Sequence, residues 1–453
     1  MSVRASGQLT GASVLVAGAG LAGLAAARDL IEMGAKVTVI EARERVGGRV
    51  LTIRDGFTES QHAEAGADLI DEEHQEIRQL AGDLGLKLSR VLRGGFGYAR
   101  PDSQGRTRIV QRNLARGWQR LSRSLGELSN RYRLADRRWD NPIAADLARQ
   151  SVSQWLQTIN ADEELRSTAI GLRGFFLADP DNLSLLALVD QFGADNGSIP
   201  GPMYRIEGGN DRLAAALAAP LRERLQLDTE LVAVSHRGRG VRVSVRHRKD
   251  LAQIQADYVI FALPASLLRR VPITPALPAQ QHEAIARLSY GKATKTLLQC
   301  SKRVWRAAGR PRAFGSPQPF GAVWDGNEEQ RGKAGILALM AGGSASDGTR
   351  EILAKDGIHG LVRSLDWIGL RQEDVVTWRQ VIWEADPWAR GGYAFFDQRF
   401  DPALRDWLAR PAGSLFFAGE HTSIAWQGYM NGAIESGRRA AAEVAASRAL
   451  ASA

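Results

Sequence analysis

The chain has 453 residues, 44% hydrophobic and 24% charged, a composition typical of globular proteins, and its length exceeds one compact core, so we expect two domains. It contains no apolar run of about eighteen residues and no apolar leader, which argues against a membrane span and against secretion and favours a cytoplasmic protein. The single cysteine, Cys300, excludes an internal disulfide. The net charge is +9, and basic residues are densest over residues 106–138, where helical spacing predicts an amphipathic helix with a solvated basic face. No nucleic-acid partner is therefore expected.

A β–α–β unit opens the chain. Its elements are a short apolar strand, a helix rich in Ala and Leu that ends at a glycine, and a second strand, at residues 14–17, 21–33 and 36–41. A unit of this kind predicts a Rossmann-like α/β domain, which binds a dinucleotide.

Three glycines with the spacing G-x-G-x-x-G lie between the first strand and the helix. Gly18 permits the tight turn, Gly20 lets the backbone approach a pyrophosphate, and Gly23 lets the helix pack closely on the sheet. Glu41 ends the second strand, where a carboxylate accepts hydrogen bonds from the adenosine ribose and disfavours the extra phosphate of NADP. The combination of strand, glycines, helix and acid predicts dinucleotide binding far more strongly than the glycines alone.

The remaining elements alternate between helical and α/β character. The pattern is mostly helical from about residue 71 to residue 200, strands return at residues 231–234, 241–245 and 258–263, and a strand at 415–418 precedes a helix at about 428–447. This order predicts one domain assembled from discontinuous segments and a second, α+β domain inserted between them. The expected boundaries are residues 1–90, 205–290 and 411–453 for the first domain, and 91–204 and 291–410 for the second.

Four segments resemble the flavin amine oxidase family, of which the monoamine oxidases are members. They are ARERVGGR at residues 42–49, EGG at 207–209, YGKATK at 290–295 and LFFAGEHTSIAWQGYMNGAIESGRRAAAEV at 415–444. The resemblance covers essentially the whole chain and is weakest at about residues 99–200. It implies FAD as the cofactor, with the first domain binding FAD and the second binding the substrate.

The resemblance also assigns cofactor contacts to individual residues. They are Gly18, Gly20, Gly23, Glu41, Arg43, Gly48, Arg49, Gly66, Ala67, Leu231, Gly419, Glu420, Gly428, Tyr429 and Met430. In the animal monoamine oxidases a cysteine precedes one cage tyrosine and bonds covalently to the flavin, but here that position is Gly392, so noncovalent FAD is expected. The seven histidines show no metal-ligand spacing, and no metal site is expected.

The catalytic residues implied by the resemblance are Lys295, Tyr393 and Tyr429. Lys295 matches the family lysine that holds a water against flavin N5, and strand alternation places Lys292 on the opposite face. Tyr393 and Tyr429 match the two walls of an aromatic cage, which orients an amine in front of the flavin and can attract a cation.

The function implied is oxidation of a small amine. A hydride passes from the α-carbon to flavin N5, the imine hydrolyses, and O₂ is reduced to hydrogen peroxide. Residues 64–69 lack the arginine that amino acid oxidases place there, and the Asp68 carboxylate is expected to repel a carboxylate substrate. An amino acid oxidase, a porphyrinogen- or carotenoid-type oxidase or desaturase, and a partner-binding flavoprotein stay open as alternatives, as do the individual amine, a protein electron acceptor and a homodimer.

Overall fold

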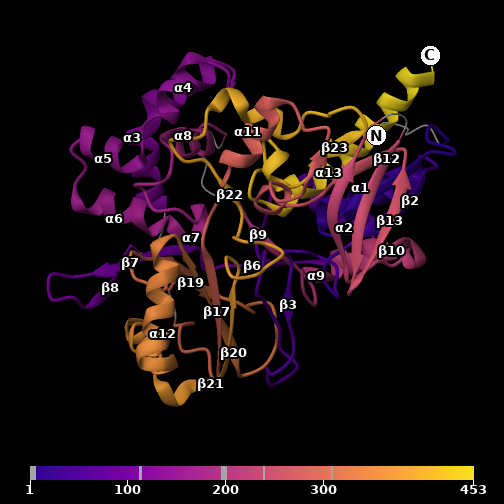
Figure 1. Ribbon diagram of the computed structural model, residues 1–453. Coiled ribbons are helices and arrows are strands. Elements are labelled where there is room, and N and C mark those ends of the chain that lie inside the picture. Colours follow the sequence, from indigo (N-terminus) through magenta and orange to yellow (C-terminus); the bar gives the residue numbers. More distant parts are fainter. Residues whose placement is uncertain (1–6, 112–114, 195–200, 238–239, 308–309, 453) are drawn as a thin grey trace.

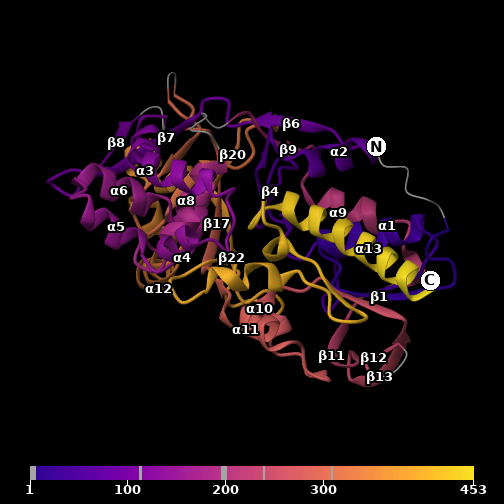
Figure 2. The same cartoon turned by 90° about the horizontal axis from the view of Figure 1, so that it is seen from above.

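The computed structural model describes residues 7–111, 115–194, 201–237, 240–307 and 310–452. Two large sheets organise this part of the chain, one of five strands and one of seven (Figure 1). The five-stranded sheet carries the first and last elements of the chain, and a group of helices, α3 to α8, lies beside the seven-stranded sheet in both views (Figure 2). Within the described residues, no helix combines the length and the apolar character needed to cross a membrane.

The five-stranded sheet is parallel throughout and has the order β10-β2-β1-β14-β23. Its strands are β1 (Ser13–Ala17), β2 (Lys36–Ile40), β10 (Leu225–Gln226), β14 (Tyr258–Phe261) and β23 (Leu415–Phe417). Central strands of a parallel sheet are buried on both faces, which explains why β1 and β14 are continuous apolar runs.

Two helices from opposite ends of the chain lie against each other on this sheet. They are α1 (Leu21–Glu32) and α13 (Met430–Ser452), which run side by side in Figure 2. Gly437 permits the close approach, since a Cβ there would lie 2.1 Å from the backbone oxygen of Ala22. The last helix is therefore part of the same core as the first.

The seven-stranded sheet has the order β21-β17-β20-β19-β18-β7-β8. Its strands are β7 (Phe96–Pro101), β8 (Thr107–Gln111), β17 (Ala293–Cys300), β18 (Ala313–Gly315), β19 (Ala322–Asp325), β20 (Gly335–Gly342) and β21 (Val375–Ile382). Its accompanying helices are α3 (Ala115–Leu134), α4 (Pro142–Ala148), α5 (Val152–Thr158), α6 (Glu163–Gly171), α7 (Arg173–Phe176), α8 (Leu185–Ala194) and α12 (Ser344–Arg363).

Smaller elements connect the two sheets. A four-stranded sheet contains β11 (Thr229–Ser235), β12 (Val241–His247), β13 (Asp250–Ala256) and β15 (Ile273–Thr274), and a three-stranded sheet contains β5 (Ile70–Asp71), β6 (Leu88–Val91) and β9 (Met203–Ile206). The two-stranded pairs are β3 (Thr52–Ile53) with β4 (Ala63–Glu64) and β16 (Ser289–Tyr290) with β22 (Ala394–Phe395). The other helices are α2 (Gln75–Asp83), α9 (Asp211–Ala218), α10 (Ala265–Leu268) and α11 (Ala279–Arg287).

The expectation of a mostly helical segment from about residue 71 to residue 200 is wrong over its first part. Strands β6, β7 and β8 occupy residues 88–111, and helices dominate only from Ala115 onward. Two of these strands pair with partners far away in the sequence, β6 with β9 and β7 with β18, and β8 pairs with β7, so tertiary pairing decides the conformation of the group. Residues 195–200 of that segment lie outside the described residues.

The mixed α/β class is as expected, and the strands fall into two sets. Every strand of the parallel sheet comes from residues 1–90, 205–290 or 411–453, and every strand of the seven-stranded sheet comes from residues 91–204 or 291–410. The division into an FAD-binding and a substrate-binding domain at these boundaries stays a prediction.

Candidate functional site

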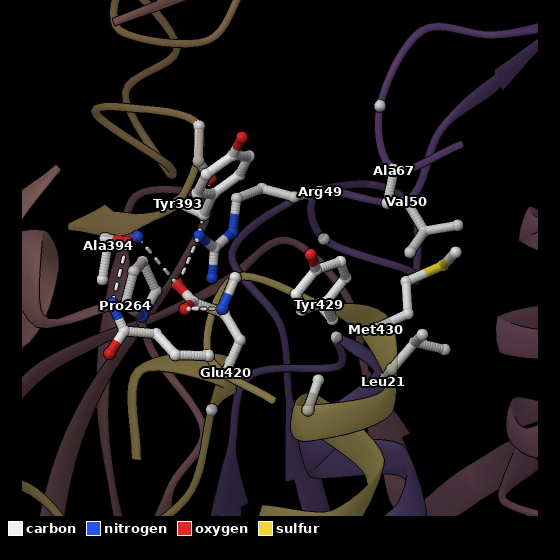
Figure 3. A pocket seen from close by; sticks show the side chains of 18 of the residues that line it. Leu21, Arg49, Val50, Ala67, Pro264, Tyr393, Ala394, Glu420, Tyr429 and Met430 are labelled. Carbon is white, nitrogen blue, oxygen red and sulfur yellow. Dashed lines mark hydrogen bonds and ion pairs between the residues drawn. The ribbon is translucent and has the colours of Figure 1, made fainter. Parts of the chain in front are cut away.

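A cavity of about 1090 Å³ is lined by residues from both large sheets. Pockets for small ligands usually measure about 300–1000 Å³, so this one has room for a large cofactor together with a small substrate. Figure 3 shows part of its lining, contributed by the N-terminal, middle and C-terminal segments of the chain.

The glycine turn after β1 forms one end of the cavity, and its three glycines differ in their surroundings. Gly18 has a φ of +106°, and a Cβ there would lie 2.7 Å from the backbone oxygen of Ala262. Gly23 faces the turn itself, since a Cβ added at Gly23 would lie 1.9 Å from the backbone oxygen of Gly18. Gly20 lines the cavity with no atom within 4 Å of a built Cβ. Gly20 alone therefore leaves space for a ligand to approach the backbone.

The N-terminus of α1 is suited to an anion. Gly20 is its N-cap residue, no side chain caps it, and its first turn contains no acidic residue. The first N–H groups of a helix lack partners within the helix and carry the positive end of its dipole. The turn thus fits the diphosphate of a dinucleotide.

Glu41 connects the glycine turn to the segment that follows β2. Its Oε2 accepts a hydrogen bond from the backbone N–H of Ala19 at 2.8 Å, and its Oε1 accepts one from that of Arg43 at 3.0 Å. The side chain is buried and lines the cavity. An ionised carboxylate offers about four acceptor sites, so Glu41 keeps capacity for ribose hydroxyls.

The two arginines expected near the diphosphate are both paired with carboxylates. Arg43 lies 2.6 Å from Asp386. Arg49 Nη1 donates to Glu420 Oε1 at 3.0 Å and to the backbone oxygen of Gly392 at 2.6 Å (Figure 3). The positive charge of both side chains is therefore already compensated within the protein.

All the expected cofactor contacts except Gly23 line this one cavity. Besides those described above, they are Gly48, Gly66, Ala67, Leu231, Gly419, Gly428 and Met430. Gly23 acts instead in the packing of α1 on the turn, which is the role its position in the motif predicts. That these residues bind FAD stays a prediction.

Lys295, on β17, and Lys292, just before that strand, face opposite ways, as strand alternation predicts. Lys295 is 2% exposed and lines the cavity, and its Nζ donates to Asp68 Oδ2 at 2.8 Å and to the backbone oxygen of Gly66 at 3.1 Å. Lys292 is 51% exposed and pairs with Asp347. Only Lys295 is placed to act inside the cavity.

Asp68 belongs to a buried cluster of charges. Besides Lys295, its carboxylate accepts hydrogen bonds from Arg205 Nε and, at 2.9 Å, from Trp324 Nε1. Burial alone would raise the pKa of Asp68, but Arg205 and Lys295 outweigh burial and lower it. The expectation that Asp68 repels a carboxylate substrate is therefore wrong, because two cations neutralise its charge. Sequence reasoning missed Arg205 and Trp324, which approach Asp68 from distant segments.

Tyr393 and Tyr429 both line the cavity (Figure 3). The Tyr393 hydroxyl donates to the backbone oxygen of Phe175, and its ring would lie 3.3 Å from a Cβ at Gly428. Burial, with the neighbouring Tyr429 and Glu420, raises the pKa of Tyr393 well above its usual value. The phenol is thus neutral at any working pH.

Two residues that sequence reasoning did not single out hold the ring of Tyr429. Its centroid lies 4.8 Å from that of His74 and 6.4 Å from that of Trp426. Burial lowers the pKa of His74 to about 4, so a neutral imidazole packs against the tyrosine. His74 offered no sequence signal, since a lone histidine before a helix is common.

Apolar and aromatic side chains form the wall on the side of Lys295 and Tyr393. They include Phe96, Phe175, Phe176, Phe314, Trp324, Met340 and Trp383. Such walls exclude water and strengthen electrostatic interactions inside the cavity. The arrangement can hold a small, largely apolar molecule beside a lysine and two tyrosine rings.

The family model for flavin-containing amine oxidoreductases matches residues 21–445. A protein of Mycobacterium tuberculosis called AofH, assigned as a flavin-containing monoamine oxidase, is 28% identical over 96% of both chains. An L-amino-acid oxidase of Notechis scutatus scutatus is 26% identical over 95% of this chain and 86% of its own. The structure of cyclohexylamine oxidase from Brevibacterium oxydans IH-35A superposes with a TM-score of 0.83 at 23% identity, over 96% of this chain and 99% of that one.

Proposed function

Because the chain belongs to the family of flavin-containing amine oxidoreductases, we propose that it is an FAD-dependent oxidase of a small amine. One observation carries the proposal: a single cavity joins the glycine turn at the start of α1 to Lys295, Tyr393 and Tyr429. The turn fits a dinucleotide diphosphate, and the tyrosines and lysine lie where a substrate would meet the rest of the cofactor.

Bound FAD would supply the redox chemistry, taking a hydride from the carbon next to the amine nitrogen, after which the imine hydrolyses and O₂ accepts the electrons as hydrogen peroxide. The chain's own residues would bind and orient the amine. The faces of Tyr393 and Tyr429 attract a cationic amine on entry, and the apolar wall then favours its neutral form. Tyr393 carries no charge that would hold the amine protonated.

We propose that FAD is bound noncovalently. Gly392 lines the cavity, and a Cβ there would lie 2.4 Å from Leu177 and 2.8 Å from Ala293, which leaves no room for a larger side chain. Cys300, the single cysteine, is buried in β17 and does not line the cavity. These observations support a cofactor held by contacts alone.

An L-amino acid is the second candidate substrate. The observation that favours it is the neutralised charge of Asp68, which removes the electrostatic argument against a carboxylate. The relative from Notechis scutatus scutatus points the same way.

Measurement of peroxide release and anaerobic flavin reduction separates these candidates. The panel contains primary, secondary and cyclic amines and the common L-amino acids. We expect at least one amine to reduce the flavin and to release peroxide in air, with slower reduction by every amino acid. Reduction by amino acids alone would replace the proposal with the second candidate, and no reduction by either class would refute both.

A further inference from the structure

Lys295 and Asp68 form an ion pair at the cavity wall that is almost fully removed from water. Their side chains are 2% and 7% exposed, and 2.8 Å separates Nζ from Oδ2. An ion pair at this depth is costly to form unless further hydrogen bonds satisfy both partners. The contacts of each partner therefore reveal what the pair is built to do.

The ammonium group of Lys295 has three N–H donors. Asp68 and the backbone oxygen of Gly66 accept two of them. Within the described residues no acceptor is recorded for the third, and Lys295 lines the cavity. Two fixed acceptors determine the direction of the third N–H, which remains for a group inside the cavity.

The carboxylate of Asp68 is itself held from three sides. Trp324 donates to the same oxygen as Lys295, Arg205 donates to the other oxygen, and Arg205 also pairs with Glu329 at 3.0 Å. The Trp324 ring lies 5.0 Å from Lys295 Nζ as well. Asp68 is thus a rigid partner that cannot rotate away from the lysine.

We propose that Asp68 is a positioning residue for Lys295: it keeps the ammonium group charged and directs its third N–H into the cavity. The inference rests on the proposed function, because it places that N–H beside the cofactor. Asp68 also lines the cavity, but in this role it acts through Lys295.

The charges around the pair explain why Asp68 is needed. The groups that face Lys295 are Asp68, Glu64 from β4 and Arg205 from β9, with Glu329 paired to Arg205. Burial lowers the pKa of Lys295, Asp68 and Glu64 oppose that effect, and Arg205 adds to it. Burial and the charge of Asp68 raise the pKa of Glu64 to about 8, so Glu64 is largely protonated near neutral pH. Near neutral pH, Asp68 is therefore the main carboxylate among the described residues that opposes the fall in the pKa of Lys295.

Removal of the Asp68 charge therefore leaves Lys295 buried beside Arg205 and lowers its pKa. Lysines buried without a partner can titrate as low as about pH 5–6. We therefore expect Lys295 to lose its proton at a lower pH without the Asp68 charge than in the wild type. A merely structural role for Asp68 would produce no such titration.

The flavin midpoint potential of the holoenzyme, measured against pH by photoreduction with a reference dye, reports this charge without any amine. Lys295→Met should lower the potential at every pH, because a nearby cation stabilises reduced flavin. Asp68→Asn should match or exceed the wild-type potential at low pH and fall toward the Lys295→Met values as pH rises. The plot of potential against pH for Asp68→Glu should run parallel to that of the wild type. The double variant Asp68→Asn/Lys295→Met should lack the break, that is, the change of slope caused by loss of the Lys295 proton.

Each outcome decides the inference. A curve for Asp68→Asn that stays parallel to the wild type overturns it, and so does a Lys295→Met variant with the wild-type potential. Asp68→Ser, a second neutral variant, replaces Asp68→Asn if that protein does not retain FAD. Addition of Glu64→Gln should move the break to lower pH, since Glu64 can ionise once Asp68 is neutral. If this pattern holds while no amine reduces the flavin, the inference stands and the proposed function fails.

Discussion

Alanine at Gly20 and alanine at Gly23 should separate cofactor binding from folding. At Gly23 the new Cβ lies 1.9 Å from the backbone oxygen of Gly18, where an ordinary contact begins at 3.4 Å, so α1 and the turn must separate by about 1.5 Å. Overpacking of this kind costs about 1–3 kcal/mol, and the better helix propensity of alanine returns about 1 kcal/mol. We expect the free energy of unfolding of the apoprotein to fall by up to about 2 kcal/mol.

Gly20 is the matched control, three residues earlier in the same motif. Its φ of −74° suits alanine, and no protein atom lies within 4 Å of the new Cβ. The apoprotein should therefore unfold within about 0.5 kcal/mol of the wild type. The Cβ projects into the cavity, where it would meet the diphosphate, so we expect FAD affinity to fall at least about tenfold, or about 1.4 kcal/mol.

Two measurements on each variant test this reasoning. Urea unfolding of the apoprotein, followed by tryptophan fluorescence, gives the stability, and titration with FAD gives the dissociation constant. Wild-type FAD affinity in Gly20→Ala would refute the placement of the diphosphate. Equal loss of apoprotein stability in the two variants would refute the separate roles of the two glycines.

Three further predictions concern the cofactor and the residues beside it. Acid precipitation should release all the yellow colour into the supernatant, since Gly392 stands where a linking cysteine would be, and colour in the pellet would contradict noncovalent binding. Lys295→Met should slow a flavin half-reaction far more than Lys292→Met, because Lys292 is exposed, and stopped-flow traces with the reverse ranking would place Lys292 at the flavin. Leucine at Tyr393 or Tyr429 should lower kcat/KM for amines more than phenylalanine does, and the effects should be non-additive in the double variant. The rate of flavin reduction should rise with pH, because only the neutral amine has the lone pair that assists hydride departure, and both leucine variants should retain that rise. Wild-type reduction rates in both leucine variants would show that the tyrosines only fill the core.

Local sequence signals predicted the glycine turn and the parallel strands well. The strand at residues 14–17 and the helix at 21–33 are found as β1 and α1, because the motif and the apolar runs are encoded over a few neighbouring residues. The same holds for Lys295, whose direction follows from alternation along one strand. Signals of this range need no knowledge of the partner segments.

The parts that could not be predicted depend on contacts between distant segments. The charge of Asp68 looked free in the sequence, but Arg205 lies 137 positions away and Lys295 lies 227 positions away. Strands β6 and β7 were missed for the same reason, since their pairing partners β9 and β18 follow much later in the chain, and β8 joins the sheet only through β7. A local pattern cannot show which charge will be neutralised or which short run will be paired.

The contact between Arg49 and Glu420 has a consequence for the order of events during synthesis. The two residues are 371 positions apart. The glycine turn is the first part of the cavity lining to be translated, and Glu420 and Gly428 are among the last. From that same late segment, strand β23 completes the parallel sheet and helix α13 packs against it. A ribosome-bound chain therefore exposes a half-built cleft, and flavin capture must wait until translation has passed the closing strand.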